Sequence, residues 1–419
     1  MSQADAVPLT RIASMPVASK PIALTRIAFL DNIRYLMVLL VVVFHAVGAY
    51  STITPHWQTH DTSFFAADII RELFDVFMMP VLFFVAGYFA LPSLEKKGVG
   101  KFLTDKVKQL LIPWGLAVLI FAPLLLYSKA VQPVRPFWSY WLWYLGSFIT
   151  GISFLPPTQT TQMVYWFISL LFAVFVLFAL AYTLTRRWRG NALPKRTRDI
   201  SVLGVLVLFG VLTSGGYFVS LLLFPDASWL SLSLFLQIPL TRLVLFVGYF
   251  AFGVYAQSRG WFTGGKPLGS LAAWGVISAV LTAAYLVACP ALFADPAGTP
   301  YLPVGFLLAF AFIRSFLLLS LLVVLVSFGV RYWNRSAGID RQLSATSYNI
   351  YLTHIWVVGM LQEELVAWTG GPALAKAAIV FLAALVLSFA LCKWVIGRYP
   401  RAFTVAILAL FVVCLAVRP

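Results

Sequence analysis

Long apolar runs separated by short polar stretches make up most of this chain. A run of about 20 apolar residues is the length that an α-helix needs to cross the hydrocarbon core of a bilayer. Lipid offers the backbone no hydrogen-bond partners, so such runs predict helices. Ten of them lie near residues 34–50, 73–91, 110–127, 163–184, 200–218, 240–256, 270–289, 304–330, 346–366 and 373–396, and a shorter one covers 402–417. The pattern predicts an all-α fold, a polytopic membrane helical bundle with a ten-helix core and a short eleventh helix.

The segment 138–155 is harder to place, and the positive charges along the chain decide its interpretation. It is aromatic and moderately apolar, and Pro156 and Pro157 follow it. If the N-terminus is cytoplasmic and this segment does not span, most of the 30 lysines and arginines fall in loops on the cytoplasmic side. Cytoplasmic loops of membrane proteins carry such an excess. We therefore expect residues 128–162 to form an extracytoplasmic or re-entrant segment.

The same topology divides the chain into three parts. Residues 1–25 lack a long apolar run, so we expect a disordered cytoplasmic tail rather than a cleaved signal peptide. Residues 26–396 form the ten-helix core, and residues 397–419 hold an extra C-terminal transmembrane helix.

Composition excludes several classes of protein. Hydrophobic residues make up 61% of the 419 positions and charged residues only 11%, whereas an average soluble domain has about 25% charged residues. A soluble globule and a disordered chain are therefore both excluded. Positive charges in cytoplasmic loops explain the net charge of +16, so no nucleic-acid partner is expected. The three cysteines lie in apolar runs without metal-ligand spacing, so no metal site is expected.

The first apolar run carries two ionisable residues that share one face of its helix. Arg34 and His45 are eleven residues apart, which is about 20° past three full turns and a rise of roughly 16 Å. Asp31, three residues before Arg34, can pair with it. An arginine at the cytoplasmic mouth can bind a phosphate, and a neutral imidazole near mid-membrane can act as a general base. The alternative is structural: a histidine that bonds between helices and an arginine that snorkels to the interface.

These residues also resemble the opening motif of a known family. Phe29-Leu30-Asp31-Asn32-Ile33-Arg34, followed by Phe44-His45, is similar to the start of the acyltransferase-3 family of integral membrane acyltransferases. Further resemblances follow in family order at Met79–Phe89, Phe102–Pro113, Trp166-Phe167 and Ser347–His354. The chain departs from the family pattern where Ala86 replaces a serine, and where Lys106 and Gln109 replace two arginines. It resembles in particular members that succinylate periplasmic glucans.

The resemblance implies an O-acyltransferase of the cell inner membrane. Such an enzyme moves an acetyl or succinyl group from cytoplasmic acyl-CoA to a hydroxyl of an extracytoplasmic glycan or polysaccharide. Acyl-CoA is then a co-substrate, no bound cofactor is expected, and the bilayer is the remaining partner. The donor-binding residues we expect are Asp31, Arg34, Lys106, Lys108, Tyr351 and His354. The alternatives are that the two lysines only follow the positive-inside rule, and that His354 only bonds between helices.

Other ionisable residues have two interpretations each. Arg314 lies at mid-membrane and needs an anion or a wet cavity; we assign it, with Trp166, to the substrate channel, and a buried structural pair is the alternative. Asp75 either orients His45 as part of the catalytic group or, near a helix start, stabilises the helix N-terminus. Arg242 is expected to snorkel to the interface.

Two further functions compete with acyl transfer. Ten or eleven helices with an arginine and two histidines at depth also fit a transporter or flippase of a glycan-related substrate, although no inverted repeat of broken helices is visible. A glycosyltransferase that uses a lipid-linked sugar would want acidic residues in a large outer loop, and the outer loops here are short. Trp57, between His56 and His60, could stack on an acceptor sugar, or the two histidines could simply be solvated loop residues.

Overall fold

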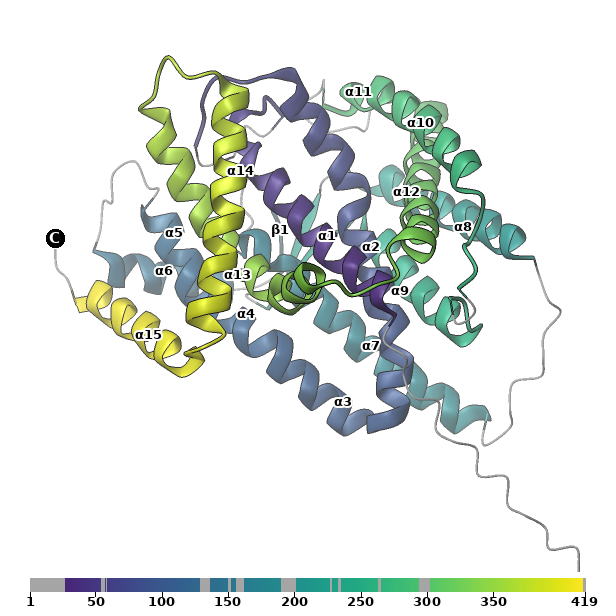
Figure 1. Ribbon diagram of the computed structural model, residues 1–419, viewed down its shortest axis with the longest axis horizontal. Helices are drawn as coiled ribbons and strands as arrows, with labels where there is room; N and C mark the ends of the chain where they lie inside the picture. Colours follow the sequence, from purple (N-terminus) through teal and green to yellow (C-terminus); the bar gives the residue numbers. More distant parts are fainter. Residues whose placement is uncertain are drawn as a thin grey trace, which may run out of the picture.

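The computed structural model describes residues 27–53, 57, 59–128, 136–149, 152–155, 162–189, 201–226, 228–232, 235–262, 265–293 and 302–416. The expected tail at 1–25 lies outside these residues, as do parts of the 128–162 segment. Nearly all of the described chain is helical, and long helices gather around α1 and α2 (Figure 1). The all-α class predicted from the apolar runs is confirmed.

Fifteen α-helices are present in the described part of the chain. Their bounds are α1 (Ala28–Ala46), α2 (Phe65–Lys97), α3 (Val99–Lys106), α4 (Ile112–Leu116), α5 (Ala122–Ser128), α6 (Phe137–Ile149), α7 (Trp166–Arg189), α8 (Val202–Leu223), α9 (Leu243–Ser258), α10 (Leu271–Ala288), α11 (Pro290–Phe293), α12 (Val304–Tyr332), α13 (Gly338–Val366), α14 (Ala373–Ala390) and α15 (Pro400–Ala416). Short 3₁₀ turns cover Gly48–Tyr50 and Met163–Tyr165, and π-helical turns cover Val107–Leu111, Ala117–Phe121 and Leu391–Ile396.

In the described part of the chain, eight helical stretches are long and apolar enough to cross a membrane. They correspond to eight of the ten predicted runs, with α3 to α5 forming a single stretch, Val99–Tyr127. The two other runs are α9, which is apolar but has only 16 residues, and α13, which is 29 residues long but more polar. The chain is therefore a multi-pass membrane protein.

The segment that was hardest to interpret from sequence contains a helix and a strand. Residues 138–155 fall in α6 and in β1 (Ile152–Leu155). β1 pairs antiparallel with β2 (Trp229–Leu232), which pairs antiparallel with β3 (Leu236–Pro239). Four-residue strands carry too little alternation to be recognised among apolar runs, and the sequence did not predict this sheet. Gln237 of β3 accepts a hydrogen bond from the backbone of Gln162, which fixes the sheet beside the start of α7.

Helices α1 and α13 run side by side in the same direction. At their start, the Asn32 amide donates to the carbonyl oxygens of Trp333 and Arg335, at 2.9 and 3.0 Å. One turn further on, the Tyr35 hydroxyl donates to the Asp340 carboxylate at 2.6 Å. The first helix is therefore held along its length by a helix that lies about 300 residues later in the sequence.

Helices α2 and α9 cross at two glycines. A methyl group on Gly87 would overlap the carbonyl oxygen of Phe250, and one on Gly253 would overlap the carbonyl oxygen of Phe84. Small residues allow membrane helices to approach backbone to backbone in this way. The neighbouring side chains Phe83 and Phe84 are fully buried, so the core lies along this crossing.

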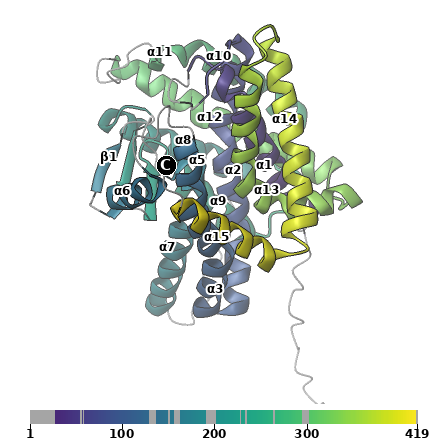
Figure 2. The same ribbon diagram turned by 90° about the vertical axis from the view of Figure 1, so that its left-hand side faces the viewer.

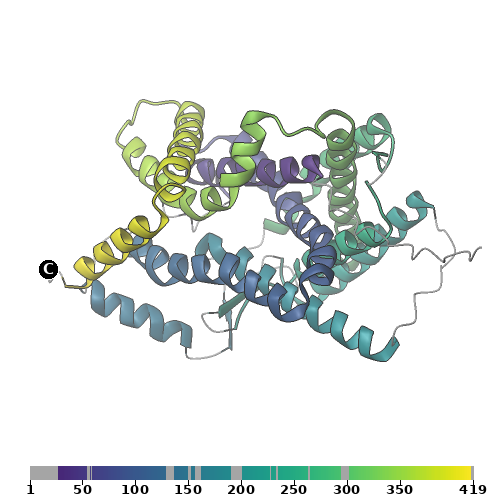
Figure 3. The same cartoon turned by 60° about the horizontal axis from the view of Figure 1, so that its bottom comes forward.

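Two peripheral features complete the bundle. Helices α3 and α7 extend together past the rest of the molecule (Figure 2), and the rings of Phe102 and Phe175 meet between them. The C-terminal helix α15 lies against α6 (Figure 3), where Phe411 contacts Phe137 and Trp141. The interpretation of α15 as an extra transmembrane helix stays a prediction.

Candidate active site

The C-terminal end of α1 is capped by side chains from two other helices. The last carbonyl groups of a helix have no partner within it. Here the carbonyl oxygen of Phe44 accepts from the Arg71 guanidinium of α2 at 2.9 Å. The carbonyl oxygens of His45 and Ala46 both accept from the Gln362 amide of α13, at 3.0 Å each. The backbone that carries His45 is thus fixed by α2 and α13.

His45 lies beside His354, although the two residues are 309 positions apart. The distance from Nδ1 of His45 to Nε2 of His354 is 3.1 Å, and both side chains are buried. Nδ1 of His354 faces the carbonyl oxygens of Ile350 and Tyr351, at 3.1 and 2.8 Å. Carbonyl oxygens only accept hydrogen bonds, so this nitrogen must carry its hydrogen.

That hydrogen fixes the tautomer of both rings. With both imidazoles neutral, Nε2 of His354 is an acceptor, and Nδ1 of His45 must be the donor to it. The lone pair of His45 then lies on Nε2, at the opposite side of the ring from His354. A general base needs a lone pair of this kind, held in place by a hydrogen bond at the other nitrogen.

Trp57 covers one face of the His45 ring. The two rings are stacked, with centroids 5.6 Å apart and planes 19° apart. The indole Nε1 donates to Oε1 of Gln362 at 2.9 Å. The Arg71 guanidinium lies over the ring of Phe44 and also over Trp57, with centroid distances of 4.1 and 5.4 Å. Trp57 is therefore held against the His45 ring by contacts with both Gln362 and Arg71.

Arg34 lies near the other end of α1, among basic residues. It forms an ion pair with Asp31 at 3.1 Å and donates to the Ser344 hydroxyl at 3.0 Å. Its side chain is 40% exposed, so it can still reach a ligand. Lys106 is close enough for its charge to interact with that of Arg34, and its ammonium lies over the ring of Phe175. Lys108 is exposed.

Tyr351 and Trp166 belong to an aromatic group that reaches His354. The Tyr351 ring lies 5.8 Å from the imidazole of His354 and 5.8 Å from the ring of Phe167, and its hydroxyl donates to the carbonyl oxygen of Val164. Trp166 contacts Trp229 of β2 edge-on at 5.2 Å. The start of α7 therefore links the small sheet to the histidine pair.

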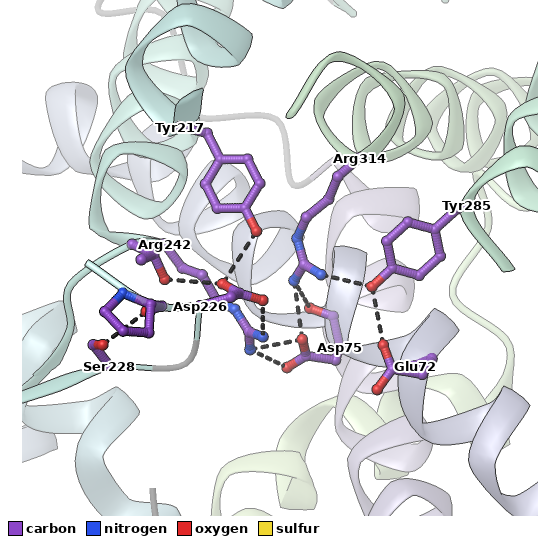
Figure 4. A network of polar contacts seen from close by, with 10 residues as sticks. Glu72, Asp75, Tyr217, Asp226, Ser228, Arg242, Tyr285 and Arg314 are labelled. Atoms are coloured by element: carbon purple, nitrogen blue, oxygen red, sulfur yellow. Dashed lines mark hydrogen bonds and ion pairs between the residues drawn. The ribbon is translucent and has the colours of Figure 1, made fainter. Parts of the chain in front are cut away.

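Asp75 and Arg314 meet in a network of ionic groups (Figure 4). The Asp75 carboxylate pairs with Arg314 at 2.9 Å and with Arg242 at 2.6 Å. Arg242 also pairs with Asp226, at 3.3 Å. Arg314 donates to the Tyr285 hydroxyl at 2.7 Å, which donates in turn to the Glu72 carboxylate at 3.1 Å. Three carboxylates and two guanidinium groups thus neutralise most of one another's charge.

The carboxylate of Asp226 shows how strong this network is. Asp226 lies in the link between α8 and β2. Burial would raise the pKa of its carboxyl, but the guanidinium groups of Arg242 and Arg314 outweigh burial and lower that pKa to about 2. The Tyr217 and Thr241 hydroxyls also donate to it.

Comparison with known families decides what this site belongs to. The model of the acyltransferase-3 family, described as an acyltransferase domain, matches residues 27–398, nearly the whole chain. This chain belongs to the acyltransferase-3 family. Comparisons with curated proteins and with solved structures give no significant match. The family predicted from the residues between Phe29 and His354 is confirmed, and the protein is a membrane acyltransferase.

In this acyltransferase the structure brings some expected residues together and separates others. His45 and His354 meet, Tyr351 lies beside them, and Arg34 pairs with Asp31 as its spacing predicts. Asp75, in contrast, is bound by Arg242 and Arg314 rather than by His45. It also lies ten residues after the start of α2 at Phe65, too far in to stabilise the N-terminal turn. Among the described residues, the side chain that contacts Nδ1 of His45 is therefore an imidazole and not a carboxylate.

Arg242 differs from its sequence interpretation too. A snorkelling arginine would direct its guanidinium to the interface, but this one is 16% exposed and lies between Asp75 and Asp226. Arg314 has the anion partner that its depth requires. Its role as a substrate contact stays a prediction, as does that of Trp166.

Sequence reasoning missed two residues of the acyltransferase site. The signal at Gln362 is weak: it is a polar residue followed by Glu363 and Glu364, a pattern typical of the polar end of a helix. Arg71 lies in the predicted extracytoplasmic link between the first two runs, where basic residues are scarce, and this scarcity is the signal that could have pointed to it. Both act by binding backbone carbonyl groups of α1, which a residue pattern does not reveal.

Proposed function

We propose that this acyltransferase moves an acetyl or succinyl group from cytoplasmic acyl-CoA to a hydroxyl of an extracytoplasmic carbohydrate, with His45 as the general base. The observation that carries the proposal is the His45–His354 pair, which gives a buried imidazole its hydrogen on one nitrogen and a lone pair on the other. The chain would lie in the inner membrane with its N-terminus in the cytoplasm.

The donor would bind along α1. The phosphate groups of CoA are anions, and Arg34 with Lys106 and Lys108 supplies cations near the start of this helix. The partly exposed Arg34 can exchange its contact with Asp31 for a phosphate. The pantetheine arm would then run along α1 toward His45, a rise of roughly 16 Å from Arg34, and place the thioester beside the imidazole.

The acceptor hydroxyl would reach His45 from the extracytoplasmic side. Nε2 takes the hydroxyl proton while the oxygen attacks the thioester carbonyl carbon. The C–S bond then breaks, and the proton on His45 passes to the leaving thiolate, giving CoA-SH and the ester. Positioned general bases contribute roughly 10²–10⁴ to the rate, and holding both substrates in one site adds the advantage of orientation. His354 would stabilise the imidazolium by accepting the hydrogen bond from Nδ1.

The test is release of CoA thiol from acetyl-CoA and from succinyl-CoA by membranes that contain the protein, with an acceptor-rich envelope extract. We expect turnover of one donor by the wild type and its loss in His45→Ala. Gly275→Ala is the control, because a methyl group there has no neighbour among the described residues within 4 Å and should leave turnover unchanged. Transfer that survives in correctly inserted His45→Ala would contradict the mechanism, and substrate flux without acyl transfer would favour a transporter.

A further inference from the structure

The link between α1 and α2, of which residues 47–53, 57 and 59–64 are described, is joined to the histidine pair through Gln362. Gln362 is 1% exposed and uses its whole amide. Its nitrogen donates to the carbonyl oxygens of His45 and Ala46, and its oxygen accepts from the indole of Trp57. A buried amide with every contact made has a single orientation. One side chain thus holds both the backbone under His45 and the ring over it.

The indole of Trp57 restricts His45 without blocking its chemistry. Stacking covers a face of the imidazole, while the nitrogens point outward in the plane of the ring. The hydrogen bond to His354 fixes one in-plane nitrogen, and the stack fixes the tilt of the plane. The hydrogen bond and the stack together fix the orientation of the imidazole, and with it the direction of the Nε2 lone pair.

Hydrogen bonds at one end and an ion pair at the other hold the same link in place. The Asp68 carboxylate accepts from the hydroxyls of Ser51 and Thr52, both at 2.7 Å. At its other end, Asp61 pairs at 2.7 Å with Lys376, which is only 1% exposed. The space for the indole is closely limited, because a methyl group on Gly48 would lie 2.6 Å from the Trp57 ring.

We propose that Gln362 and Trp57 are positioning residues that aim Nε2 of His45 at the acceptor hydroxyl. The proposal rests on the function proposed above. It assigns a catalytic task to the α1–α2 link: this link holds the base at its working angle. Both residues act through His45, since neither Gln362 nor the stacked face of Trp57 has a free group to offer to a substrate.

Substitutions that remove single contacts test the proposal. Gln362→Glu replaces the donating nitrogen by an oxygen that repels the two α1 carbonyl groups, and Trp57→Phe keeps a stacking ring but loses the Nε1 hydrogen bond. We expect kcat of acyl transfer to fall by roughly 10- to 100-fold in each, since small misplacements of a reacting group have costs of this order. The KM for acyl-CoA should stay at its wild-type value, because the donor phosphates bind at the other end of α1. The double variant should lose little more than the worse single variant, because both changes act through the orientation of one ring, that of His45.

Gly48→Ala is an independent variant that leaves all three side chains unchanged. Its methyl group meets the indole and should displace it, lowering kcat by roughly 10-fold. Gly275→Ala is the matched control, since a methyl group there has no neighbour among the described residues within 4 Å. A raised KM for acyl-CoA, additive losses in the double variant, or wild-type kcat in Gly48→Ala would each overturn the proposal.

A readout without turnover separates this proposal from the proposed function. Diethyl pyrocarbonate modifies neutral imidazoles, and mass spectrometry measures its rate at each histidine. Because the two contacts fix the direction of Nε2, the modification rate at His45 should change several-fold in Gln362→Glu and Gly48→Ala, while the exposed His60 keeps its wild-type rate. An unchanged rate at His45 overturns the positioning role. A changed rate, together with no acyl transfer by the wild type, leaves the positioning intact and contradicts the proposed function.

Discussion

The histidine pair and the network around Asp75 are both buried and polar, yet they differ in whether they leave a group that can react with a substrate. In the network, Arg314 is bound by Asp75 and Arg242 by Asp75 and Asp226, and a substrate could bind there only by displacing an ion pair. In the pair, one hydrogen bond orients two rings and leaves a lone pair on Nε2 of His45. Buried charges that are paired with one another hold segments of the chain together, whereas a general base must keep a lone pair that can accept a proton. Of the two regions, the pair is the one with a group able to react.

Removing the acceptor behind His45 should have the largest effect. His354→Phe keeps an aromatic ring but cannot accept the hydrogen bond from Nδ1 of His45, so the tautomer and the imidazolium both lose their support. We expect kcat for acyl transfer to fall by about 10²–10⁴, measured by release of CoA thiol. Near-wild-type turnover in a well-inserted variant would mean that the pair is only a contact between helices.

Breaking the network should act on stability instead. Arg314→Met leaves Asp75 without its 2.9 Å partner and Tyr285 without a donor. Loss of one partner of a buried ion pair typically costs about 3–5 kcal/mol. Because Arg242 still pairs with Asp75, we expect a cost near the lower end of this range, which SDS titration of the purified protein in mixed micelles can measure. If Arg314→Met unfolds like the wild type but no longer transfers acyl groups, Arg314 contacts substrate, as its assignment to the channel predicts.

Acid should weaken the network through Asp226. A carboxyl whose pKa is lowered to about 2 in the folded protein, against about 3.9 in the unfolded chain, stabilises the fold above about pH 4. That contribution is lost as the pH falls toward 2. The difference in unfolding free energy between the wild type and Asp226→Asn should therefore be constant above about pH 5 and shrink at lower pH. A difference that stays constant down to pH 3 would show that the arginines do not hold this carboxylate.

Sequence patterns predicted the helices and the contacts between residues close in sequence, but not the contacts between distant segments. Helical periodicity placed Arg34 and His45 on one face and Asp31 within reach of Arg34, because these relations depend only on residues per turn. The contact between His45 and His354 depends on how α1 packs on α13, which no local pattern contains. Asp75 shows the same limit, since its partners come from the start of α9 and the middle of α12. The small sheet was not predicted for a different reason: its strands are as apolar as the helices around them.

The glycine crossing of α2 and α9 has a mechanical consequence. With Gly87 against the carbonyl of Phe250 and Gly253 against that of Phe84, neither helix can slide along the other without driving a side chain into the opposing backbone. Asp75 and Arg242 stand on these two helices, so the register of the crossing also sets the register of their ion pair. We therefore expect α2 and α9 to move as one rigid unit. An opening that admits or releases a substrate would then require other helices to move relative to this unit.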